Sequence, residues 1–247
     1  EDGCLVTICA RRERVLAEAA AEIGHGARYT VCDVTDDDQV RAAIEFAAEP
    51  TGNLDIAVAN AGGGGTAGPL VLNDLDGWNA TIALTLTSTL STIKHAAPRM
   101  AQGGGGSIVA VSSIAGHMTH RNLGAYCVAK AGVEMLVRNA ADELGRYGIR
   151  VNGVRPGLVP TEMAAGLSET EATRDDYLAQ MPLGRLGTTE DIGAAVRFLA
   201  GPESTWITGQ LLGVDGGHSL RRGPNLDPVM EPMFSAAMES LMGSERD

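Results

Sequence analysis

The chain has 247 residues, of which 44% are apolar and 20% are charged, and its formal net charge is −12. This composition is typical of a folded globular protein and excludes a long disordered chain. The negative charge argues against a nucleic-acid-binding surface, which needs clustered lysine and arginine. No apolar run reaches the roughly 18 residues that span a bilayer, and no signal peptide is recognisable. We therefore expect a cytoplasmic protein that binds neither nucleic acid nor membrane.

Short apolar segments alternate with amphipathic segments along most of the chain. Most of the apolar segments are apolar throughout, as parallel strands covered on both faces are. The predicted strands are residues 5–9, 27–32, 55–59, 107–111, 150–154 and 211–215. The predicted helices are residues 11–23, 36–49, 74–101, 124–146 and 188–200. This order predicts an α/β fold with a doubly wound parallel sheet and right-handed crossovers.

Two helix starts have the residue pattern of a capping box. Thr35 with Asp38, and Thr188 with Asp191, can satisfy the free amides of a first helical turn. The four cysteines contain no CxxC pair, and Cys9 and Cys32 lie in apolar segments. We expect these two thiols to be buried and reduced.

Polar residues and glycines follow four of the predicted strands. They are Asp33, Asn60 to Gly62, Ser112 with Ser113, and Pro156 with Gly157. In doubly wound sheets, ligands bind beyond the carboxyl ends of the strands. The pattern therefore predicts one binding site at that edge of the sheet.

Two glycine-rich segments invite a phosphate-binding interpretation. Residues 63–68, GGGTAG, match GxGxxG, but Pro69 and not a helix follows, and Ser88 stands about where an acid is expected. We interpret this segment as a loop beside the site, and residues 103–106 as a turn before a strand.

The start of the chain contains a predicted strand without a phosphate-binding turn before it. A missing neighbouring strand would leave a gap of about 4.8 Å in the sheet, with unpaired backbone groups on both sides. We expect the sequence to be an N-terminally incomplete form of a longer protein, lacking a first strand and a glycine-rich turn.

Residues 111 to 130 contain a serine, a tyrosine and a lysine at a suggestive spacing. Tyr126 and Lys130 lie in YCVAK, and Ser113 lies thirteen residues before the tyrosine in VSS. The further motifs are CDV (32–34), NAG (60–62), RPG (155–157) and VDGG (214–217). In this order, the set resembles the classical short-chain dehydrogenase/reductase family over about residues 1–219.

The resemblance implies catalytic roles for these three residues. Tyr126 would exchange a proton with the substrate oxygen, although a free phenol has a pKa of about 10. Lys130, one helical turn later, would favour the phenolate and hydrogen-bond the nicotinamide ribose. Ser113 would hold the substrate oxygen. An isolated YxxxK is more often an ordinary helix face, and the other motifs favour the catalytic interpretation.

The resemblance also implies a dinucleotide cofactor. Ala10 stands where an NAD-selecting acid is usual, and Arg11 and Arg12 follow it. Guanidinium groups favour a 2′-phosphate, so NADP is the predicted cofactor and NAD the alternative. The other expected cofactor contacts are Asp33, Val34, Asn60, Ala61, Gly62, Tyr126, Lys130, Pro156, Gly157 and Thr161.

One position departs from the family pattern. The family usually has an asparagine in the long helix, which extends a proton relay through water. Aligned on Trp78, the asparagine position is Thr85 here. A hydroxyl can bind water but lacks an amide's two groups, so the relay is rerouted or catalysis is slower.

The segment from Leu158 to Leu183 resembles the family's mobile lid. The residues expected to line a largely apolar substrate pocket are His117, Met118, Met163 and Leu167, with Leu178 and Met181 in the same lid. His117 and His120 form HxxH without further ligands at suitable spacing, so no metal site is predicted.

Residues 220–247 form a tail beyond the catalytic domain of residues 1–219. Met230, Phe234, Met238 and Leu241 repeat at helical spacing. This apolar stripe can pack on its own subunit or on a neighbouring one. The family is commonly oligomeric, so we expect a homo-tetramer or a dimer.

The resemblance predicts an NADP(H)-dependent oxidoreductase that interconverts a secondary alcohol and a ketone on a largely apolar small molecule. A reductase of 3-oxoacyl thioesters is the alternative enzyme. A catalytically weak regulatory or structural relative that binds the cofactor is the alternative of another class.

Overall fold

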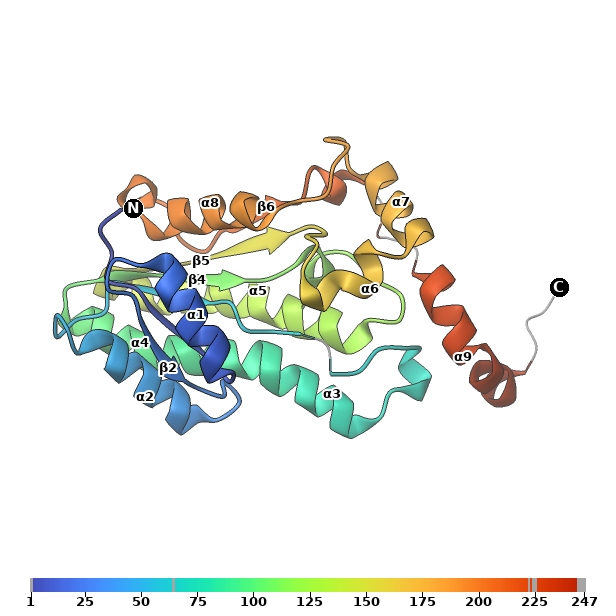
Figure 1. The fold of residues 1–247 in the computed structure, drawn as a ribbon, viewed down its shortest axis with the longest axis horizontal. Helices are drawn as coiled ribbons and strands as arrows, with labels where there is room; N and C mark the ends of the chain where they lie inside the picture. The colour runs from blue at the N-terminus through green and yellow to red at the C-terminus, as the bar shows by residue number, and fades with distance from the viewer. Residues whose placement is uncertain (1, 64, 222, 224–225, 244–247) are drawn as a thin grey trace.

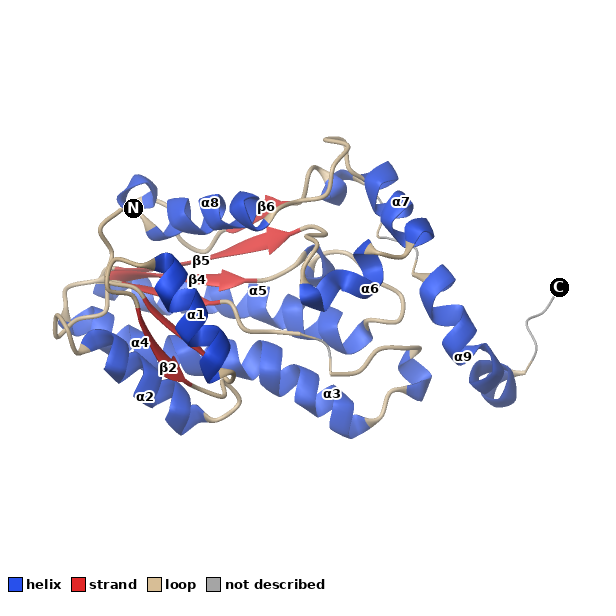
Figure 2. Ribbon diagram, viewed as in Figure 1, coloured by secondary structure: helices blue, strands red, loops and turns tan. Residues whose placement is uncertain are grey.

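Two parallel sheets form the centre of the molecule, and helices cover them on both sides (Figures 1 and 2). The computed structural model describes residues 2–63, 65–221, 223 and 226–243. One sheet has the order β1-β2 and the other β3-β4-β5-β6. Their bounds are β1 (Thr7–Ala10), β2 (Arg28–Val31), β3 (Ile56–Ala59), β4 (Gly106–Val111), β5 (Ile149–Pro156) and β6 (Leu211–Val214). All six predicted strands are confirmed, each within two residues of its predicted bounds.

The helices largely follow the predicted pattern. The longer ones are α1 (Glu13–Ile23), α2 (Asp37–Ala48), α4 (Ser88–Gln102), α5 (Gly124–Leu144), α8 (Thr189–Ala200) and α9 (Asp227–Met242). The shorter ones are α3 (Leu75–Ile82), α6 (Ala165–Ser168) and α7 (Glu171–Gln180). None of the described helices combines the length and the apolar character needed to cross a membrane.

The predicted helix over residues 74–101 is interrupted, so this prediction was wrong in detail. A π-helical turn, Ala83–Thr87, separates α3 from α4. Such turns insert one extra residue into the helical ladder and are frequent at functional sites. Thr85 lies inside this turn.

The strands of the larger sheet are covered on both faces. In β4, Ile108 and Ala110 pack against α4 and α5, while Val109 on the opposite face packs with Leu199 of α8. All three β4 side chains are fully buried. This two-sided burial is the reason why the strand sequences are apolar throughout rather than alternating.

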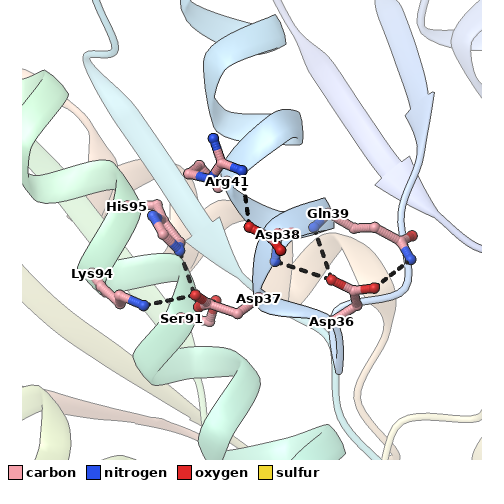
Figure 3. A network of polar contacts seen from close by, with 8 residues as sticks. All are labelled: Asp36, Asp37, Asp38, Gln39, Arg41, Ser91, Lys94 and His95. Atoms are coloured by element: carbon pink, nitrogen blue, oxygen red, sulfur yellow. Dashed lines mark hydrogen bonds and ion pairs between the residues drawn. The ribbon is translucent and has the colours of Figure 1, made fainter.

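One of the two predicted capping boxes is confirmed. At the start of α8, the Thr188 hydroxyl accepts from the Asp191 amide and the Asp191 carboxylate accepts from the Thr188 amide. At the start of α2 the cap is Asp36, not Thr35, because the Asp36 carboxylate accepts from the amides of Asp38 and Gln39 (Figure 3). The local pattern alone did not separate these adjacent candidates.

A slot separates the two sheets. In the described parts of the chain, β1 pairs only with β2, and β3 pairs only with β4. A cavity of about 740 Å³ lies between them and is lined by both strands. Val58 of β3 is 43% exposed, and Cys9 of β1, expected to be buried, is exposed. The first described strand begins at Thr7, and no turn of the predicted glycine-rich type precedes it in the described residues.

The lid segment and the tail pack together at one end of the molecule, where Figure 2 shows α9 beside α7 and away from the sheet. Leu226 and Met230 are buried in a cluster with Tyr177 of α7 and Met181. Phe234 also packs against this cluster. The beginning of the predicted apolar stripe therefore packs within the subunit, whereas Leu241 is exposed.

Candidate active site

The side chains of Ser113, Tyr126 and Lys130 lie together beyond the carboxyl end of β4. Ser113 follows that strand and caps a short 3-10 turn, Ile114–Gly116, where its hydroxyl accepts from the Ala115 amide at 3.1 Å. Tyr126 and Lys130 lie on the first turns of α5, and the Lys130 ammonium is 5.6 Å from the Tyr126 ring centroid. The Ser113 side chain acts on Tyr126 by lowering the pKa of its phenol. The structure thus brings the three predicted catalytic residues together.

Burial controls the electrostatics of this group. Lys130 is 3% exposed, and its ammonium donates to the carbonyl of Val111 at 2.6 Å. Desolvation lowers the pKa of Lys130 to about 8, because burial penalises the charged form. Burial raises the pKa of Tyr126, and the hydrogen bond from Ser113 opposes that rise. Burial therefore outweighs the hydrogen-bonding effect that favours a phenolate.

Thr85 holds the glycine loop that follows β3 against this site. Its hydroxyl accepts from the Gly63 amide at 3.1 Å and donates to the Gly63 carbonyl at 2.9 Å. A Cβ at the preceding Gly62 would lie 3.0 Å from the Lys130 ammonium nitrogen. The Thr89 hydroxyl donates to the Thr85 carbonyl at 2.9 Å. The loop interpreted from GGGTAG is therefore beside the site, and Thr85 anchors it by hydrogen bonds.

Several predicted cofactor residues line the cavity between the two sheets. These residues are Arg11, Val34, Asn60, Ala61 and Gly62. They come from the carboxyl ends of β1, β2 and β3, where ligands bind in sheets of this kind. Arg11 and Gly62, which are 51 positions apart in the chain, therefore line the same cavity.

Two predicted cofactor residues, Asp33 and Arg12, contact other side chains of the protein. The Asp33 carboxylate accepts from the amide and hydroxyl of Thr35, and these bonds lower its pKa. The Arg12 guanidinium lies 3.4 Å from the Glu162 carboxylate, and both side chains are exposed. Arg12 thus connects the start of α1 to the lid segment.

The carboxyl end of β5 supplies Pro156 and Gly157. A Cβ at Gly157 would lie 2.9 Å from the Asp215 Cα, so this close approach to the residue after β6 requires a glycine. Thr161 is exposed at the start of the lid, before a 3-10 turn over Glu162–Ala164.

The four predicted pocket residues differ in their burial. Met118 and Leu167 pack around the buried cluster that contains Ile114, Leu158 and Tyr177. Met163 is 67% exposed, and His117 is exposed too.

Two buried residues near this cluster have no assigned role in the sequence prediction. Tyr177 has a pKa raised mainly by burial and also by the nearby Tyr126 phenol. Its ring makes an edge-to-face contact with His218 at 5.4 Å. His120 is also buried, with its Nδ1 atom 3.1 Å from the Met118 carbonyl oxygen.

A buried ion pair also lies behind the site and was missed by sequence reasoning. Glu134 of α5 contacts Arg155, the residue directly before Pro156, through both carboxylate oxygens. The available signals were the spacing of four between Lys130 and Glu134 and the charged residue inside a buried strand.

Comparison with known proteins agrees with this architecture. A family model described as Enoyl-(Acyl carrier protein) reductase matches residues 1–219. A cis-4-hydroxycyclohexanecarboxylate dehydrogenase from Sinomonas cyclohexanicum is 40% identical over 205 residues, covering 83% of this chain and 81% of that protein.

Solved structures agree as well. A short-chain dehydrogenase/reductase from Mycobacterium ulcerans has a TM-score of 0.92 at 39% identity, covering 95% of this chain and 88% of that one. A gluconate 5-dehydrogenase from Burkholderia cenocepacia, solved with NADP and tartrate, has a TM-score of 0.84 at 32% identity, covering 89% and 87%. The chain therefore belongs to the short-chain dehydrogenase/reductase family, and it is a dehydrogenase that acts on CH–OH groups with NAD(P).

Proposed function

We propose that the protein transfers hydride between NADP(H) and a small, largely apolar molecule, interconverting a secondary alcohol and a ketone. The observation that supports this proposal most strongly is the grouping of Ser113, Tyr126 and Lys130 at the end of β4, next to the cavity lined by Gly62. The described residues fit a dinucleotide because an open cavity of about 740 Å³ meets the carboxyl ends of three strands. When bound, the nicotinamide supplies or accepts the hydride.

The side chains divide the remaining chemistry among them. The Tyr126 hydroxyl gives a proton to the substrate oxygen during reduction and takes it back during oxidation. The Ser113 hydroxyl, already a partner of Tyr126, donates a hydrogen bond to the same oxygen as negative charge develops on it. Lys130 holds a positive charge within 5.6 Å of the Tyr126 ring centroid, which favours loss of the phenol proton.

Replacing Tyr126 by phenylalanine tests this assignment. General acid–base groups contribute roughly 100-fold to 10,000-fold to rates, so we expect Tyr126→Phe to lose at least that lower factor in kcat while still binding NADPH. Tyr147→Phe is the matched control, because Tyr147 is half-exposed at the end of α5. Turnover near wild type in Tyr126→Phe would remove the proposed role.

We propose NADP(H) rather than NAD(H) because Arg11 lines the cavity and Ala10 leaves no carboxylate there to repel a 2′-phosphate. The related gluconate 5-dehydrogenase was solved with NADP. Arg11→Ala should lower kcat/KM for NADPH by roughly tenfold to hundredfold and leave that for NADH nearly unchanged, since a charged hydrogen bond contributes roughly 1.5–3 kcal/mol. Arg14→Ala, in the first turn of α1 and paired with Glu18, is the control. A wild-type preference for NADH would contradict this choice.

We also propose that the slot between β1 and β3 accepts one further parallel strand, followed by a glycine-rich turn for the cofactor pyrophosphate. The slot has an apolar lining, and each flanking strand has one unpaired edge in the described structure. Fusing a strand, a TGxxxGxG turn and a crossover helix before Glu1 should raise NADPH affinity and slow amide exchange in both β1 and β3. Unchanged exchange in those strands would contradict the proposal.

For the substrate, we propose a cyclic or branched alcohol or ketone rather than a 3-oxoacyl thioester. The lid cluster around Met118 and Leu167 is apolar, and a relative acts on a hydroxycyclohexanecarboxylate. The description of the matching family model keeps acyl thioesters as the second candidate. NADPH oxidation against a panel of ketones, aldehydes and acyl thioesters decides between them. Failure of the whole panel would favour a cofactor-binding relative with little catalysis.

We propose that residues 1–219 form the catalytic domain and that the tail contributes to a homo-oligomeric assembly. The tail helix α9 buries its beginning on its own subunit, whereas Met233, Leu241 and Met242 are exposed. Removing residues after Ser219 should change the mass measured by light scattering or raise the substrate KM. No change in either would contradict a role for the tail.

A further inference from the structure

One carboxylate behind the site connects three separate chain segments. Glu134 lies one turn after Lys130 on α5, and its side chain is 5% exposed. Its Oε1 atom accepts from Arg155 Nε at 2.7 Å, and its Oε2 atom accepts from Arg155 Nη2 at 2.9 Å. The Ser112 hydroxyl donates to Oε1 at 3.1 Å.

The three segments are those that carry the proposed reaction. Ser112 precedes Ser113 at the end of β4, Arg155 precedes Pro156 at the end of β5, and Glu134 follows Lys130. The Ser112 hydroxyl also lies 3.4 Å from the Lys130 carbonyl oxygen. No other described carboxylate makes these contacts with both strand ends.

The contacts of Glu134 with Ser112 and Arg155 lie where the backbone pairing between β4 and β5 ends. The paired register of β4 and β5 ends at Val111 opposite Val154, and the Ser112 amide donates to the Val154 carbonyl at 2.8 Å. Beyond that point the chains diverge, because Ser113 enters a 3-10 turn and the Gly157 amide donates to Val214 on β6. The two strand ends therefore need another connection, and the Glu134 carboxylate supplies one.

The turn after Ser113 is also packed directly on this carboxylate. A Cβ at Gly116 would lie 2.8 Å from Glu134 Oε1 and 2.9 Å from the Lys130 backbone carbon. A bidentate pair between guanidinium and carboxylate fixes orientation as well as distance. Both the strand ends and this turn are thus located relative to one side chain of α5.

We propose that Glu134 is a positioning residue, whose paired contact with Arg155 and bond from Ser112 hold Ser113, Lys130 and the Pro156–Gly157 loop in register. This inference rests on the proposed function for its kinetic readout. Glu134 touches neither substrate nor cofactor in this scheme. Its effect is carried by the segments that it connects.

The decisive variant is the double replacement Glu134→Leu with Arg155→Met. Replacing both members of a buried ion pair by apolar residues of similar volume often leaves stability unchanged. We expect the melting temperature to stay close to that of wild type, while kcat/KM falls at least tenfold and the Kd for NADPH, measured by fluorescence titration, rises at least fivefold. Two variants are the controls. Glu143→Leu changes the exposed face of α5, and Arg138→Met removes only the contact at 3.8 Å between Arg138 and Glu134. Both should leave kcat/KM and the Kd for NADPH unchanged.

A double variant with wild-type kcat/KM and Kd would overturn the proposal and make the pair purely structural. Glu134→Gln and Arg155→Lys provide the same test if the double variant does not fold. Each keeps one hydrogen bond and should show an intermediate loss, and wild-type kinetics in both would also overturn the proposal.

Hydrogen exchange separates this inference from the proposed function. Amides of residues 112–116 and 157–161 should exchange faster in the double variant than in wild type, with β2 unchanged, whether or not NADPH is bound. Unchanged exchange in both segments would contradict positioning. If wild type binds no NADPH and reduces no substrate, the proposed function fails, and the exchange result still decides the role of Glu134.

Discussion

Two carboxylates in this protein each connect separate elements through three or more polar contacts, yet their surroundings differ. Asp37 of α2 contacts Ser91, Lys94 and His95 of α4 at 2.6, 2.7 and 3.0 Å (Figure 3). Its side chain is 51% exposed, whereas that of Glu134 is 5% exposed.

This difference in burial indicates that the number of polar contacts does not determine how much they contribute to the free energy of unfolding. Exposed ion pairs are weakened by water and salt, and most contribute little to stability. A buried charge whose partner is removed cannot regain water, so breaking a buried pair is costly. Removing one partner of the Asp37 network should therefore cost little stability, and removing one partner of the buried Glu134–Arg155 pair should cost much more.

The largest expected effect comes from removing one partner of the buried pair. Arg155→Met leaves the Glu134 carboxylate buried without its guanidinium and should reduce the free energy of unfolding by about 3–5 kcal/mol. Urea denaturation at pH 7 measures this loss. Lys94→Met removes the corresponding cation from the Asp37 network and is the matched comparison. Equal losses in the two variants would break the distinction between buried and exposed networks.

The buried Lys130 makes the stability of the protein depend on pH. Its folded pKa of about 8 lies below the ordinary value of 10.5, so the unfolded chain binds more protons between these values. Stability must then rise as pH increases from about 8 towards 10.5, and the cost of the buried charge is fully present below pH 8. From pH 7 to 10 this contribution amounts to about 2 kcal/mol. Lys130→Met should abolish that part of the rise, and denaturation at several pH values measures it.

The increase in unfolding free energy must be measured below pH 10, where the ionisation of Tyr126 has little influence on stability. Burial raises the folded pKa of Tyr126 above its ordinary value, so its contribution to stability is lost only as pH increases beyond about 10. A slope that is the same in wild type and in Lys130→Met would show that Lys130 is not the group responsible.

Thr85 is buried and uncharged, so we expect its contribution to stability to lie between those of the Glu134 pair and the Asp37 network. Thr85→Val keeps the shape but leaves the Gly63 amide and carbonyl without their shared partner, so a loss of roughly 1–3 kcal/mol in unfolding free energy is expected. Thr85→Ser keeps the hydroxyl and should retain most of the stability. Equal behaviour of the two variants would show that the hydroxyl does not hold the glycine loop.

The sheet and the grouping of Ser113, Tyr126 and Lys130 could be predicted because each depends on local patterns. Continuous apolar runs such as residues 107–111 mark strands covered on both faces, and the spacing of Tyr126 and Lys130 places them on one helix face. Ser113 could be included because it directly follows such a strand. The family motifs then indicated which of several similar patterns mattered.

The features that could not be predicted depend on contacts between distant segments. The pairing of Glu134 with Arg155 requires the packing distance between α5 and β5, which no residue pattern contains. The π-helical turn around Thr85 is stabilised by the Gly63 backbone, 22 positions away. The choice of Asp36 over Thr35 as the cap of α2 depends on which residue first adopts the extended backbone. Exposure of Cys9 follows from the slot beside β1, because an apolar strand sequence does not reveal whether its edge is covered.

The smallest expected effect tests the exposed side of the comparison. Asp37→Asn should lower the melting temperature only slightly at pH 7, and added salt should make the difference smaller still because exposed pairs are screened. Contacts from Lys94, Ser91 and His95 depress the pKa of Asp37 below its ordinary value of 3.8. Its stabilising contribution is therefore present above that value and is lost as pH falls further. Thermal scans from pH 7 to below pH 3 should show the difference between the two proteins beginning to shrink near pH 3.8 and shrinking further in stronger acid.

Asp38→Asn is the control, because Asp38 pairs with Arg41 inside α2 and connects no second element. If the Asp37 network holds α2 to α4, Asp37→Asn should lose more stability at pH 7 than Asp38→Asn, and both should lose far less than Arg155→Met. A loss in Asp37→Asn as large as that in Arg155→Met would mean that the network behaves as a buried one. Burial would then not be what separates these two carboxylates, and a partner covering α2 and α4 would have to shield Asp37 from water.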